Sequence, residues 1–584
     1  MRRSIATVCL SGTLDEKLQA ASAAGFDGVE LFEADLINSP LAPTAVRELA
    51  DELGLSIDLY QPFRDFEAVA HPDFRRAEAK FDVMEALGAP TMLVCSNVRP
   101  DAIDDDALAA EHLHALAARA HERGLKIAYE ALAWGRHVST YDHAWRIVEQ
   151  ADHPALGTCL DSFHILSRGT DLATIDRIPG EKIFYLQLAD APRKAMDVLQ
   201  WSRHYRCFPG QGALDVAGLL RRVLATGYDG PLSLEVFNDV FRQADARRTA
   251  IDAMRSLILL EQTPLPAPAP LHGFAFVEIG VDADSAPDLE ALLRAMGFAH
   301  AGPHRSKPVQ LWEHGAIRVV LNHGAGEDDP EVVAIAVTSE DPAASAERAH
   351  ALLAPSLERR RGTGEADLTA VAAPDGTAVF FCGSDWLGDF LPTGEPATDG
   401  VPIERIDHIT LAQPFEAFDE AGLFYRSVLD LEPSESAELA APDGLVRSRA
   451  YAGGDVRVVL NVPALAGHER TELQHVAFAT DDALATARAL RDRGVPLLEV
   501  PDNYYDDLEA RLDLDAAHLR ELGVLYDRTP EGELLHFYIA PIGGRVFFEV
   551  LERRGGYRGY GALNSSVRMA AQSRGERHAE GAGA

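Results

Sequence analysis

The stretch KIFYLQLAD at residues 182–190 is apolar along most of its length and carries Gln187 near its carboxyl end. A run with apolar side chains on both faces is typical of a parallel strand that helices cover on both sides. Helical stretches such as DEKLQAASAAG and DVAGLLRRVLATG separate it from similar runs. These other runs are IATVCL (5–10), GVELFE (28–33), SIDLYQP (56–62), TMLVCSN (91–97), KIAYEAL (126–132), ALGTCLDS (155–162) and LSLEVFN (232–238).

The number and spacing of these runs predict an α/β fold, a (β/α)8 TIM barrel over residues 1–263. Eight strand–helix units in about 260 residues match the size of such a barrel. A doubly wound sheet is the alternative, but that fold gives no reason for the number eight. The alternating prolines of TPLPAPAPL (263–271) indicate a stiff, exposed linker, so we expect a domain boundary there.

After the linker the chain repeats itself with a period of about 130 residues. We predict two copies of an α+β unit, at 272–393 and 403–565, and a disordered tail at 566–584, which is small and polar. The segment PTGEPATDGVP (392–402) lies between the copies. The matching stretches are GFAFVEIGVD (273–282) with ERIDHITLAQ (404–413), IRVVLN (317–322) with VRVVLN (456–461), VVAIAVTSEDPAASAERAHALLA (332–354) with LQHVAFATDDALATARALRDRG (473–494), and VFFCGS (379–384) with VFFEVL (546–551).

The composition is that of an ordinary globular protein, with 47% apolar and 25% charged residues among 584. A formal net charge of −37 would repel a phosphate backbone, so we expect no nucleic-acid partner. No apolar run is long enough to span a membrane, and the first residues lack a signal-peptide pattern, so we expect a cytoplasmic protein. The five cysteines are scattered and form no CxxC pair, which argues against disulfides and a thiolate metal site.

Four oxygen-bearing side chains stand late in the last four runs of the predicted barrel: Glu130, Asp161, Gln187 and Glu235. Barrel enzymes carry their catalytic residues at the carboxyl ends of the strands, and alternation places all four side chains on the inward face. Three carboxylates packed together would repel one another unless a cation lies among them. Because every donor is an oxygen, we expect a divalent cation such as Mg²⁺, Mn²⁺ or Co²⁺ rather than zinc.

On these residues the first half of the chain resembles the sugar-phosphate-isomerase-like barrel superfamily, whose opening is similar to SGTLDEKLQAASAAGFDGVELFE (11–33). Together with the duplicated unit, residues 1–565 resemble the bacterial two-domain 3-dehydroshikimate dehydratases. The resemblance implies conversion of 3-dehydroshikimate to protocatechuate and water, in the catabolism of quinate and shikimate. It also implies that Glu130, Asp161, Gln187 and Glu235 are the metal ligands.

The chemistry of this reaction assigns expected roles to neighbouring residues. The substrate is a ketone with an adjacent hydroxyl and a second hydroxyl β to the carbonyl. Removal of the α proton gives an enolate that a cation stabilises, and loss of the β-hydroxyl leaves an aromatic ring. His164, three residues after Asp161, is the expected general base of near-neutral pKa, with a packing or capping role as the alternative. Glu33 is a candidate proton-transfer or supporting acid.

Two arginines are candidates for binding the carboxylate of the substrate, because a guanidinium forms a two-pronged pair with a carboxylate. Arg64 in YQPFRDFE and Arg206 in SRHYRCFPGQG follow strands on the catalytic side of the predicted barrel. Each could equally form a surface ion pair. Ser202 and Tyr205 are further candidates for contact with the substrate.

In the second copy, LQHVAFAT (473–480) places His475 inside an apolar strand, where an unpaired polar group costs free energy. One buried histidine is usually structural, but His408 in IDHITL and Glu549 in FFEVL lie on two further predicted strands. Two imidazoles and a carboxylate are the donor set of non-haem Fe(II) sites. We therefore expect a second divalent cation, Fe²⁺ or Mg²⁺, in this copy. The matching residues of the first copy are Glu278 for His408, Ala334 for His475 and Cys382 for Glu549, so that copy is predicted to lack metal ligands.

The second copy resembles the vicinal oxygen chelate superfamily and especially 4-hydroxyphenylpyruvate dioxygenase. The stretches that carry this resemblance are IDHITL (406–411), LQHVAFAT (473–480), YYDDLEARL (504–512) and GRVFFEVLERRGGYRGYGALN (544–564). The resemblance implies that His408, His475 and Glu549 are metal ligands. In the fused family it implies a retained metal-binding module that supports assembly or stability, or acts on an unidentified ligand.

Two other functions stay open on the sequence alone. The barrel could be a metal-dependent sugar or hydroxypyruvate isomerase, a class that usually has a histidine in its metal set or a second acidic base. The C-terminal unit could be a 4-hydroxyphenylpyruvate-type Fe(II) dioxygenase, which would consume oxygen and an α-keto acid. The sequence also leaves open whether the chain forms a homo-oligomer.

Overall fold

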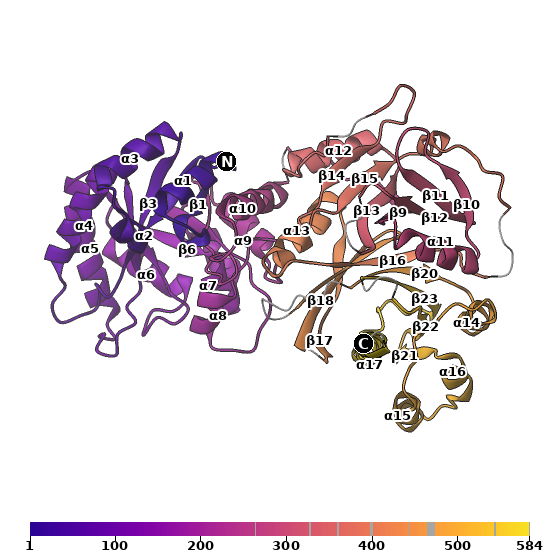
Figure 1. Ribbon diagram of the computed structural model, residues 1–584. Helices are drawn as coiled ribbons and strands as arrows, with labels where there is room; N and C mark the ends of the chain where they lie inside the picture. The colour runs from indigo at the N-terminus through magenta and orange to yellow at the C-terminus, as the bar shows by residue number, and fades with distance from the viewer. Residues whose placement is uncertain are drawn as a thin grey trace. The chain divides into compact units, whose positions relative to one another are not determined.

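A computed structural model gives the architecture of the protein (Figure 1). It describes residues 1–262, 264–325, 329–358, 361–396, 401–442, 444–463, 473–541 and 545–582, with side chains up to residue 574. The chain divides into two compact units, Met1–Thr263 and Pro264–Ala584. Residues 397–400, in the segment expected between the two copies, lie outside the described residues.

Eight parallel strands close into a barrel in the first unit, because β1 pairs with both β2 and β8. Strands that are neighbours in the chain are also neighbours in the barrel, which confirms the predicted (β/α)8 fold and rules out the doubly wound alternative. The strands are β1 (Arg3–Ala6), β2 (Gly28–Phe32), β3 (Ser56–Phe63), β4 (Thr91–Cys95), β5 (Lys126–Glu130), β6 (Leu156–Asp161), β7 (Ile183–Leu188) and β8 (Leu232–Leu234).

Helices cover the outside of the barrel (Figure 1). Buried apolar side chains lie on its inside. Ala128, Cys159 and Tyr185, each two residues before an expected ligand, pack in one buried cluster with Leu59 and Leu93. Alternation along the strands therefore directs the expected ligands to the inside as well. The helices are α1 (Leu14–Ala23), α2 (Glu33–Asn38), α3 (Pro43–Glu52), α4 (Phe74–Leu87), α5 (Asp106–Glu122), α6 (Tyr141–Ala151), α7 (Ser162–Ser167), α8 (Val198–His204), α9 (Val216–Ala225) and α10 (Ala246–Glu261).

The second unit contains two mixed sheets, ordered β10-β11-β12-β9-β13-β15-β14 and β17-β18-β19-β16-β20-β23-β22-β21. The first sheet consists of β9 (Leu271–Gly280), β10 (Ala299–Pro303), β11 (Val309–His314), β12 (Ile317–Asn322), β13 (Glu331–Ser339), β14 (Thr369–Ala372) and β15 (Ala378–Cys382). The second consists of β16 (Arg405–Ala412), β17 (Glu432–Ala441), β18 (Gly444–Gly453), β19 (Val456–Pro463), β20 (Gln474–Ala479), β21 (Leu525–Thr529), β22 (Gly532–Tyr538) and β23 (Val546–Gly555).

The two sheets share one topology, which confirms the predicted duplication. The strands β9, β13 and β15 occupy the places that β16, β20 and β23 occupy in the second sheet, and β21 is an addition to the second copy. A helix follows the corresponding strand in each copy, α12 after β13 and α14 after β20. The helices of this unit are α11 (Ala286–Ala295), α12 (Pro342–Ala351), α13 (Phe418–Val428), α14 (Ala483–Asp492), α15 (Asp502–Leu512), α16 (Ala517–Leu522) and α17 (Ala562–Ala582).

The C-terminal segment differs from the prediction of a disordered tail at 566–584. Residues 562–582 form helix α17, and Arg568, Met569 and Gln572 on it are buried. Met569 packs with Leu439 of β17 and Val446 of β18. The polar composition of the last residues conceals these contacts, because single side chains spaced along the helix make them. None of the helices in the described part of the chain is long and apolar enough to cross a membrane.

Candidate metal centres

Three of the four expected barrel ligands lie at the carboxyl ends of strands at the same end of the barrel. Glu130 is the last residue of β5, Asp161 is the last residue of β6, and Glu235 directly follows β8. Their exposed fractions are 3%, 2% and 5%. Three carboxylates are thus withdrawn from water at one end of the barrel, where each ionised group disfavours the ionisation of its neighbours.

One oxygen of the Glu130 carboxylate lies near the other ligand candidates without a hydrogen-bond partner among the described residues. Its Oε2 accepts a hydrogen bond from the Cys95 thiol at 3.4 Å, whereas its buried Oε1 has no hydrogen-bond partner among the described residues. Glu130 Oε1 lies 3.7 Å from His164 Nε2, and Asp161 Oδ2 lies 3.8 Å from the same nitrogen. One ligand atom from each of these three residues falls within 4.8 Å of the others. An unpartnered buried oxygen beside a second carboxylate and an imidazole fits a divalent cation.

Arg206 supplies the positive charge that two of the carboxylates share. Its Nη1 donates to Asp161 Oδ2 at 2.7 Å and to Glu235 Oε2 at 3.1 Å. Its Nε and Nη2 donate to Ser202 Oγ at 3.1 and 2.9 Å. The structure therefore places Arg206 among the expected metal ligands, and not in the free position that binding of the substrate carboxylate would require.

The crowding of charge shifts the pKa values of these groups in different directions. Burial and the neighbouring charge of Glu235 raise the pKa values of Glu130 and Glu30 well above the ordinary range. Burial also raises the pKa of Glu235 to about 7. Burial opposes ionisation of Asp161 too, but Arg206 and His164 hold its pKa below the ordinary value. Asp161 is therefore the most readily ionised of the four, and a bound cation would favour ionisation of the others.

Gln187, the fourth expected ligand, is held by a carboxylate that the sequence analysis missed. Gln187 Nε2 donates to Glu30 Oε2 at 2.7 Å, and its Oε1 accepts from the Cys159 thiol at 3.2 Å. Gln61 Nε2 donates to Glu30 Oε2 at 3.0 Å and to Glu235 Oε1 at 2.9 Å. Glu30 is thus one hydrogen bond away from Gln187 and two from Glu235, and it orients both. The signal in the sequence was an acidic residue in the middle of the apolar run GVELF.

His164 faces the carboxylates, and a hydrogen-bond donor lies against each of its ring nitrogens. The backbone N–H of Ala133 lies 3.2 Å from its Nδ1, and Arg206 Nη2 lies 3.2 Å from its Nε2, the atom that faces Glu130 and Asp161. A neutral imidazole accepts at one nitrogen only, so these contacts do not assign the proton to either, and the general base stays a prediction. Burial lowers the pKa of His164 to about 3. The ring is therefore neutral at pH 7.

A cavity of about 270 Å³ opens over this group. Arg64 and Ser202 line it, as the sequence led us to expect, and so do His164 and Arg206. Glu33 and Tyr205 are not part of its lining. The further lining residues are Phe32, Gln61, Leu93, Cys95, Glu130, Leu132, Trp134, Arg203, His204, Glu235, Phe237 and Arg242.

Glu33 and Tyr205 have other partners. Glu33 accepts a hydrogen bond from the Tyr60 hydroxyl at 3.0 Å and forms an ion pair with Lys80. Tyr205 is 37% exposed, and the Lys194 ammonium lies 4.8 Å from the centre of its ring. Neither residue lines the cavity, and the roles suggested for them by the sequence analysis stay predictions.

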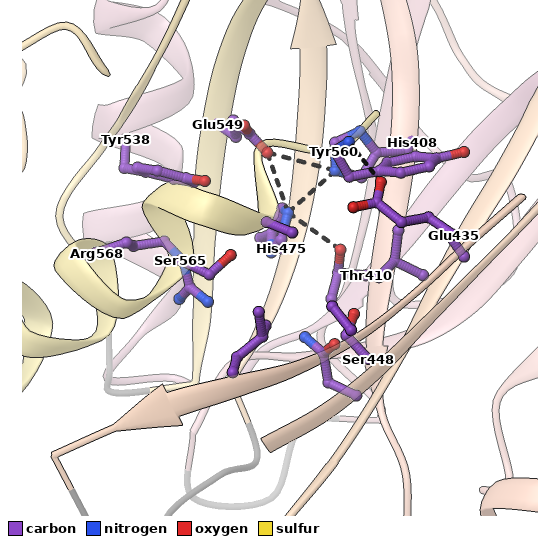
Figure 2. Close-up of a pocket in the computed structure, with 16 residues that line it drawn as sticks. His408, Thr410, Glu435, Ser448, His475, Tyr538, Glu549, Tyr560, Ser565 and Arg568 are labelled. Atoms are coloured by element: carbon purple, nitrogen blue, oxygen red, sulfur yellow. Dashed lines mark hydrogen bonds and ion pairs between the residues drawn. The ribbon is translucent and has the colours of Figure 1, made fainter. Parts of the chain in front are cut away.

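A second pocket lies in the C-terminal unit (Figure 2). Its wall is formed by the second sheet and by α17. His408, His475 and Glu549 line it, together with polar side chains that include Thr410, Ser448 and Asn461 from the sheet and Ser565 and Arg568 from α17.

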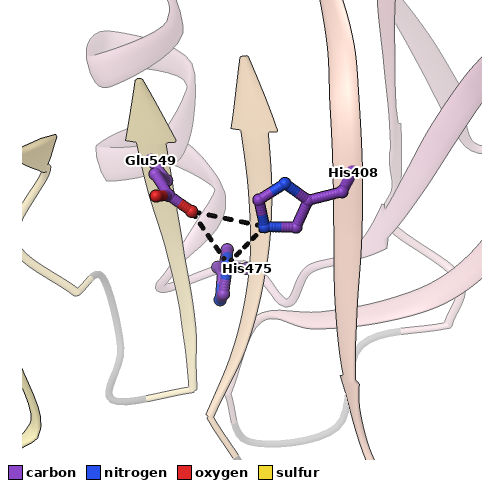
Figure 3. A group of neighbouring side chains, drawn as sticks. All are labelled: His408, His475 and Glu549. Atoms are coloured by element: carbon purple, nitrogen blue, oxygen red, sulfur yellow. Dashed lines mark hydrogen bonds and ion pairs between the residues drawn. The ribbon is translucent and has the colours of Figure 1, made fainter. Parts of the chain in front are cut away.

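His408 of β16, His475 of β20 and Glu549 of β23 converge at one point of this pocket (Figure 3). The two histidine Nε2 atoms are 3.2 Å apart, and Glu549 Oε2 lies 3.3 Å from His408 Nε2 and 3.2 Å from His475 Nε2. Burial lowers the pKa of His475 to about 4, which keeps the ring in the neutral form that binds metals. Three evenly spaced ligand atoms on adjacent strands fit one face of a cation's coordination shell.

Neighbouring side chains orient this triad. His408 Nδ1 contacts Asp407 Oδ1 at 3.0 Å, and Arg553 Nη2 donates to the same oxygen at 2.8 Å. On the other side, His536 Nδ1 contacts Glu549 Oε1 at 2.7 Å. These contacts leave His408 Nε2 and Glu549 Oε2 directed at the centre of the triad, as in metal sites whose ligands are held by outer hydrogen bonds.

The first copy places apolar side chains where the triad stands. Strand register puts Ala334 at the position of His475, as predicted, but Phe276 at the position of His408 and Phe380 at that of Glu549. Glu278 lies at the position of Thr410, which is not a member of the triad. Among the described residues of the first copy, no group of metal-ligating side chains meets at the equivalent place. The three counterparts pack in one buried cluster, with the two phenylalanine ring centres 5.7 Å apart. The predicted pairing of His408 with Glu278 and of Glu549 with Cys382 was wrong by two residues in each strand.

Three known families match successive parts of the chain. The family described as "Xylose isomerase-like TIM barrel" matches residues 18–257. "Hydroxyphenylpyruvate dioxygenase, HPPD, N-terminal" matches residues 266–386, and "Glyoxalase/Bleomycin resistance protein/Dioxygenase superfamily" matches residues 405–537. The order and extent of these matches follow the barrel and the two copies of the second unit.

Several known proteins resemble the chain along most of its length. A 3-dehydroshikimate dehydratase of Pseudomonas putida is 46% identical over 98% of both chains, and one of Pseudomonas aeruginosa is 46% identical over 99% of both. A solved "xylose isomerase-like TIM barrel/4-hydroxyphenylpyruvate dioxygenase fusion protein" is 44% identical, with a TM-score of 0.90 over 98% of this chain and 100% of that one. A 4-hydroxyphenylpyruvate dioxygenase of Pseudomonas aeruginosa is 28% identical over 51% of this chain and 92% of its own length.

Proposed function

The chain belongs to the family of 3-dehydroshikimate dehydratases, and we propose that its barrel converts 3-dehydroshikimate to protocatechuate and water by metal-assisted β-elimination. This makes it a carbon–oxygen lyase. Identity of 46% over nearly the whole length of two members of the family supports the overall reaction. The roles of individual residues are argued from the geometry below.

The observation that carries the proposal is the buried group of Glu130, Asp161 and His164 beside the 270 Å³ cavity. Glu235 joins this group through Arg206. An apolar cavity of roughly 150 Å³ holds one benzene ring, so this one has room for a six-membered ring with its carboxylate and hydroxyls. Its lining offers both charged and polar side chains to a ketone and its hydroxyls, among them Gln61, Glu130 and Ser202.

Glu130, Asp161 and Glu235, with Gln187 as a neutral fourth donor, would hold the cation. Mg²⁺, Mn²⁺ or Co²⁺ bound there would supply positive charge to the ketone oxygen and its neighbouring hydroxyl. Glu30 and Gln61 fix the directions of the Gln187 and Glu235 side chains through the hydrogen bonds described above. The ligand side chains therefore need little rearrangement on binding.

Arg64 is the arginine that we assign to the substrate carboxylate. Arg206 is committed to Asp161 and Glu235, whereas Arg64 lines the cavity and forms no ion pair with the residues that the structure describes. A two-pronged pair with the carboxylate would fix the ring in one orientation over the carboxylates. A guanidinium in this place also rejects uncharged sugars, which are the substrates of the alternative isomerase function.

His164 acts in this proposal as a neutral hydrogen-bond donor. In the tautomer that accepts the Ala133 N–H at Nδ1, Nε2–H can donate to the oxygen on which negative charge grows as the α proton leaves, whereas in the other tautomer Nε2 accepts from Arg206 Nη2. The α proton then passes to one of the carboxylates that face the cavity. The β-hydroxyl leaves as water when that carboxylic acid returns the proton to it, and enolisation of the remaining ketone by loss of a ring proton completes the aromatic ring.

The test is the appearance of protocatechuate absorbance when the purified protein is mixed with 3-dehydroshikimate and Mg²⁺, Mn²⁺ or Co²⁺ in the absence of oxygen. Glu235→Ala should lower kcat/KM by at least about 100-fold, because the cation loses a charged ligand. Glu33→Gln is the matched control, since this carboxylate lies outside the cavity lining, and it should turn over as the wild type does. Normal turnover by Glu235→Ala would contradict the proposed site.

His164 requires a separate comparison. His164→Gln keeps an N–H donor and should retain more turnover than His164→Ala. Equal loss in both variants would instead favour the role predicted from the sequence, in which His164 is the general base.

The C-terminal triad is proposed as a metal-binding module of Fe²⁺ or Mg²⁺ rather than a dioxygenase. Oxygen uptake with 4-hydroxyphenylpyruvate would overturn that assignment, and oxygen electrode traces with and without this substrate measure it directly.

A further inference from the structure

The proposed dehydration removes two protons from carbon, and they have different destinations. The first comes from the carbon next to the ketone and leaves with the β-hydroxyl as water. What remains is a ring ketone with two carbon–carbon double bonds and one methylene group. This ring becomes aromatic when the methylene carbon loses a proton and the ketone oxygen gains one. The second proton has no leaving hydroxyl to join, so its acceptor must be able to release it to water.

The buried carboxylates are poorly placed for such an exchange, because Glu130, Asp161 and Glu235 are at most 5% exposed. His204 is an imidazole of the same cavity that water does reach. It is the last residue of α8 and lines the cavity together with Glu130 and Glu235. Its side chain is 40% exposed, whereas that of His164 is 4% exposed. An imidazole that contacts both a cavity and water can pass a proton between them.

Asp239, in the segment that follows β8, fixes the tautomer of the His204 ring. His204 Nδ1 lies 2.8 Å from Asp239 Oδ2, and a carboxylate oxygen accepts a hydrogen bond but does not donate one. The neutral ring therefore has its proton on Nδ1 and its free electron pair on Nε2. Asp239 is not part of the cavity lining, and Nε2 has no hydrogen-bond partner among the residues that the structure describes. Nε2 is thus the nitrogen left to a ligand in the cavity.

The two histidines of the cavity differ in this respect. Whichever nitrogen of His164 lacks the proton already faces a donor, since Ala133 N lies 3.2 Å from Nδ1 and Arg206 Nη2 lies 3.2 Å from Nε2. His204 has an acceptor on one side of its ring and a free nitrogen on the other. A carboxylate that holds a histidine in one tautomer also stabilises the imidazolium that forms when the ring takes up a proton. His204 therefore has the arrangement of a base.

We propose that His204, oriented by Asp239, is a further catalytic residue of the dehydration and removes the second proton. A C–H bond of the ring methylene breaks, its electron pair becomes a double bond of the aromatic ring, and the proton goes to Nε2. The ketone oxygen takes up a proton and becomes a hydroxyl of the product, while His204 returns its proton to water. The step needs no oxidant or further reactant. This inference rests on the function proposed for the barrel.

The test compares 3-dehydroshikimate that carries deuterium at the ring methylene with the same substrate deuterated next to the ketone, using the full chain and Mn²⁺. In His204→Ala we expect kcat to fall about 100-fold, the contribution of a general base, with KM nearly unchanged. Removal of the second proton then becomes the slow step. Deuterium at the methylene should therefore slow the variant more than it slows the wild type, and deuterium next to the ketone should lose its effect.

Two further variants separate a base from a packing role. His204→Gln can still form hydrogen bonds but cannot take up a proton, so it should lose as much turnover as His204→Ala. Asp239→Asn should also lower kcat, because an amide can donate to Nδ1 and hold the ring proton on Nε2.

The matched control is His143→Ala. His143 Nε2 lies 2.7 Å from Asp106 Oδ1, so this residue is also a histidine paired with an aspartate in the barrel unit, but it lies outside the cavity lining. It should turn over as the wild type does.

Two results would overturn the proposal. One is near-normal kcat in His204→Ala and His204→Gln, and the other is a loss of kcat in which deuterium at the methylene has no larger effect than in the wild type. Thermal unfolding of each variant without substrate checks that it is folded. Failure of the wild type to form protocatechuate would instead refute the function proposed for the barrel, so the two failures are distinguishable.

Discussion

At the scale of single residues, the barrel site brings several acidic side chains together away from water. Glu30, Glu130, Asp161 and Glu235 are all buried, and Arg206 is the cation that pairs with two of them. Glu130, Asp161 and Glu235 could be identified from the sequence, because each stands at the carboxyl end of a strand. It did not show Glu30, which acts through the amides of Gln61 and Gln187 and not by facing the cavity.

Glu67 lies outside the carboxylate group and allows a prediction about pH. Its Oε1 accepts hydrogen bonds from Asn97 N at 2.6 Å and from the Tyr129 hydroxyl at 3.1 Å, while burial raises its pKa from the ordinary 4.5 to about 7. Between these two values the folded state holds a proton that the unfolded state has lost. The free energy of unfolding therefore falls as pH rises through this window, by at most about 3 kcal/mol from this group.

Glu67→Gln should remove this contribution, because an amide does not titrate and its oxygen can still accept both hydrogen bonds. Denaturant unfolding of the variant and the wild type at pH 5 and pH 8 measures it. The variant should gain stability relative to the wild type as pH rises. A difference that stays constant between the two pH values would contradict the raised pKa.

At the scale of elements, Asp161 at the junction of β6 and α7 has two roles: it caps the helix and it is a proposed metal ligand. Asp161 Oδ1 accepts a hydrogen bond from His164 N at 3.0 Å and so caps the N-terminus of α7. Asp161 Oδ2 accepts from Arg206 at 2.7 Å. The cap also fixes the first turn of the helix that carries His164, which places the imidazole against the carboxylates.

Two substitutions separate the two roles of Asp161. Asparagine caps helices about as well as aspartate, so Asp161→Asn should keep the cap and lose the charge, whereas Asp161→Ala should lose both. We expect both variants to lose at least about 100-fold in kcat/KM. Urea unfolding without added metal should find Asp161→Asn more stable than Asp161→Ala by about 1 kcal/mol. Appreciable turnover by Asp161→Asn would remove Asp161 from the proposed metal ligands.

At the scale of the whole molecule, the two units contain separate candidate metal centres built on unrelated frameworks. The barrel gathers its ligands from the ends of parallel strands, and the second sheet gathers its triad from the faces of β16, β20 and β23. The first copy of the duplicated unit fills the equivalent place with Phe276, Ala334 and Phe380. One copy thus has an apolar core where the other has the candidate metal triad of His408, His475 and Glu549.

Scanning calorimetry with and without metal should reveal these two centres as separate stabilisations. A ligand that binds only the folded state at 100 times its Kd adds about 2.7 kcal/mol to the stability of the unit that binds it. His475→Ala should abolish the shift that Mg²⁺ produces in the transition of the second unit, and Glu235→Ala should abolish the shift in that of the barrel. Loss of both shifts in either single variant would mean that the two centres are not independent.

The sequence by itself determined the closed barrel, the duplication and the groups of donors at the strand ends. These follow from patterns that are local in the chain, namely strand periodicity, the spacing of strand–helix units and repeated stretches. It also indicated His475 correctly as one of a set, because its counterpart in the other copy is alanine.

Only the tertiary structure decided which groups meet. Glu30 and Gln187 are 157 positions apart and Glu549 contacts His408 across the sheet, so no local pattern reveals these pairs. The charge of Arg206 is satisfied by Asp161 and Glu235 because burial makes an unpaired guanidinium costly. The burial of Arg568 and Gln572 on α17 likewise became visible only once the chain was folded, because the polar composition suggested a disordered tail.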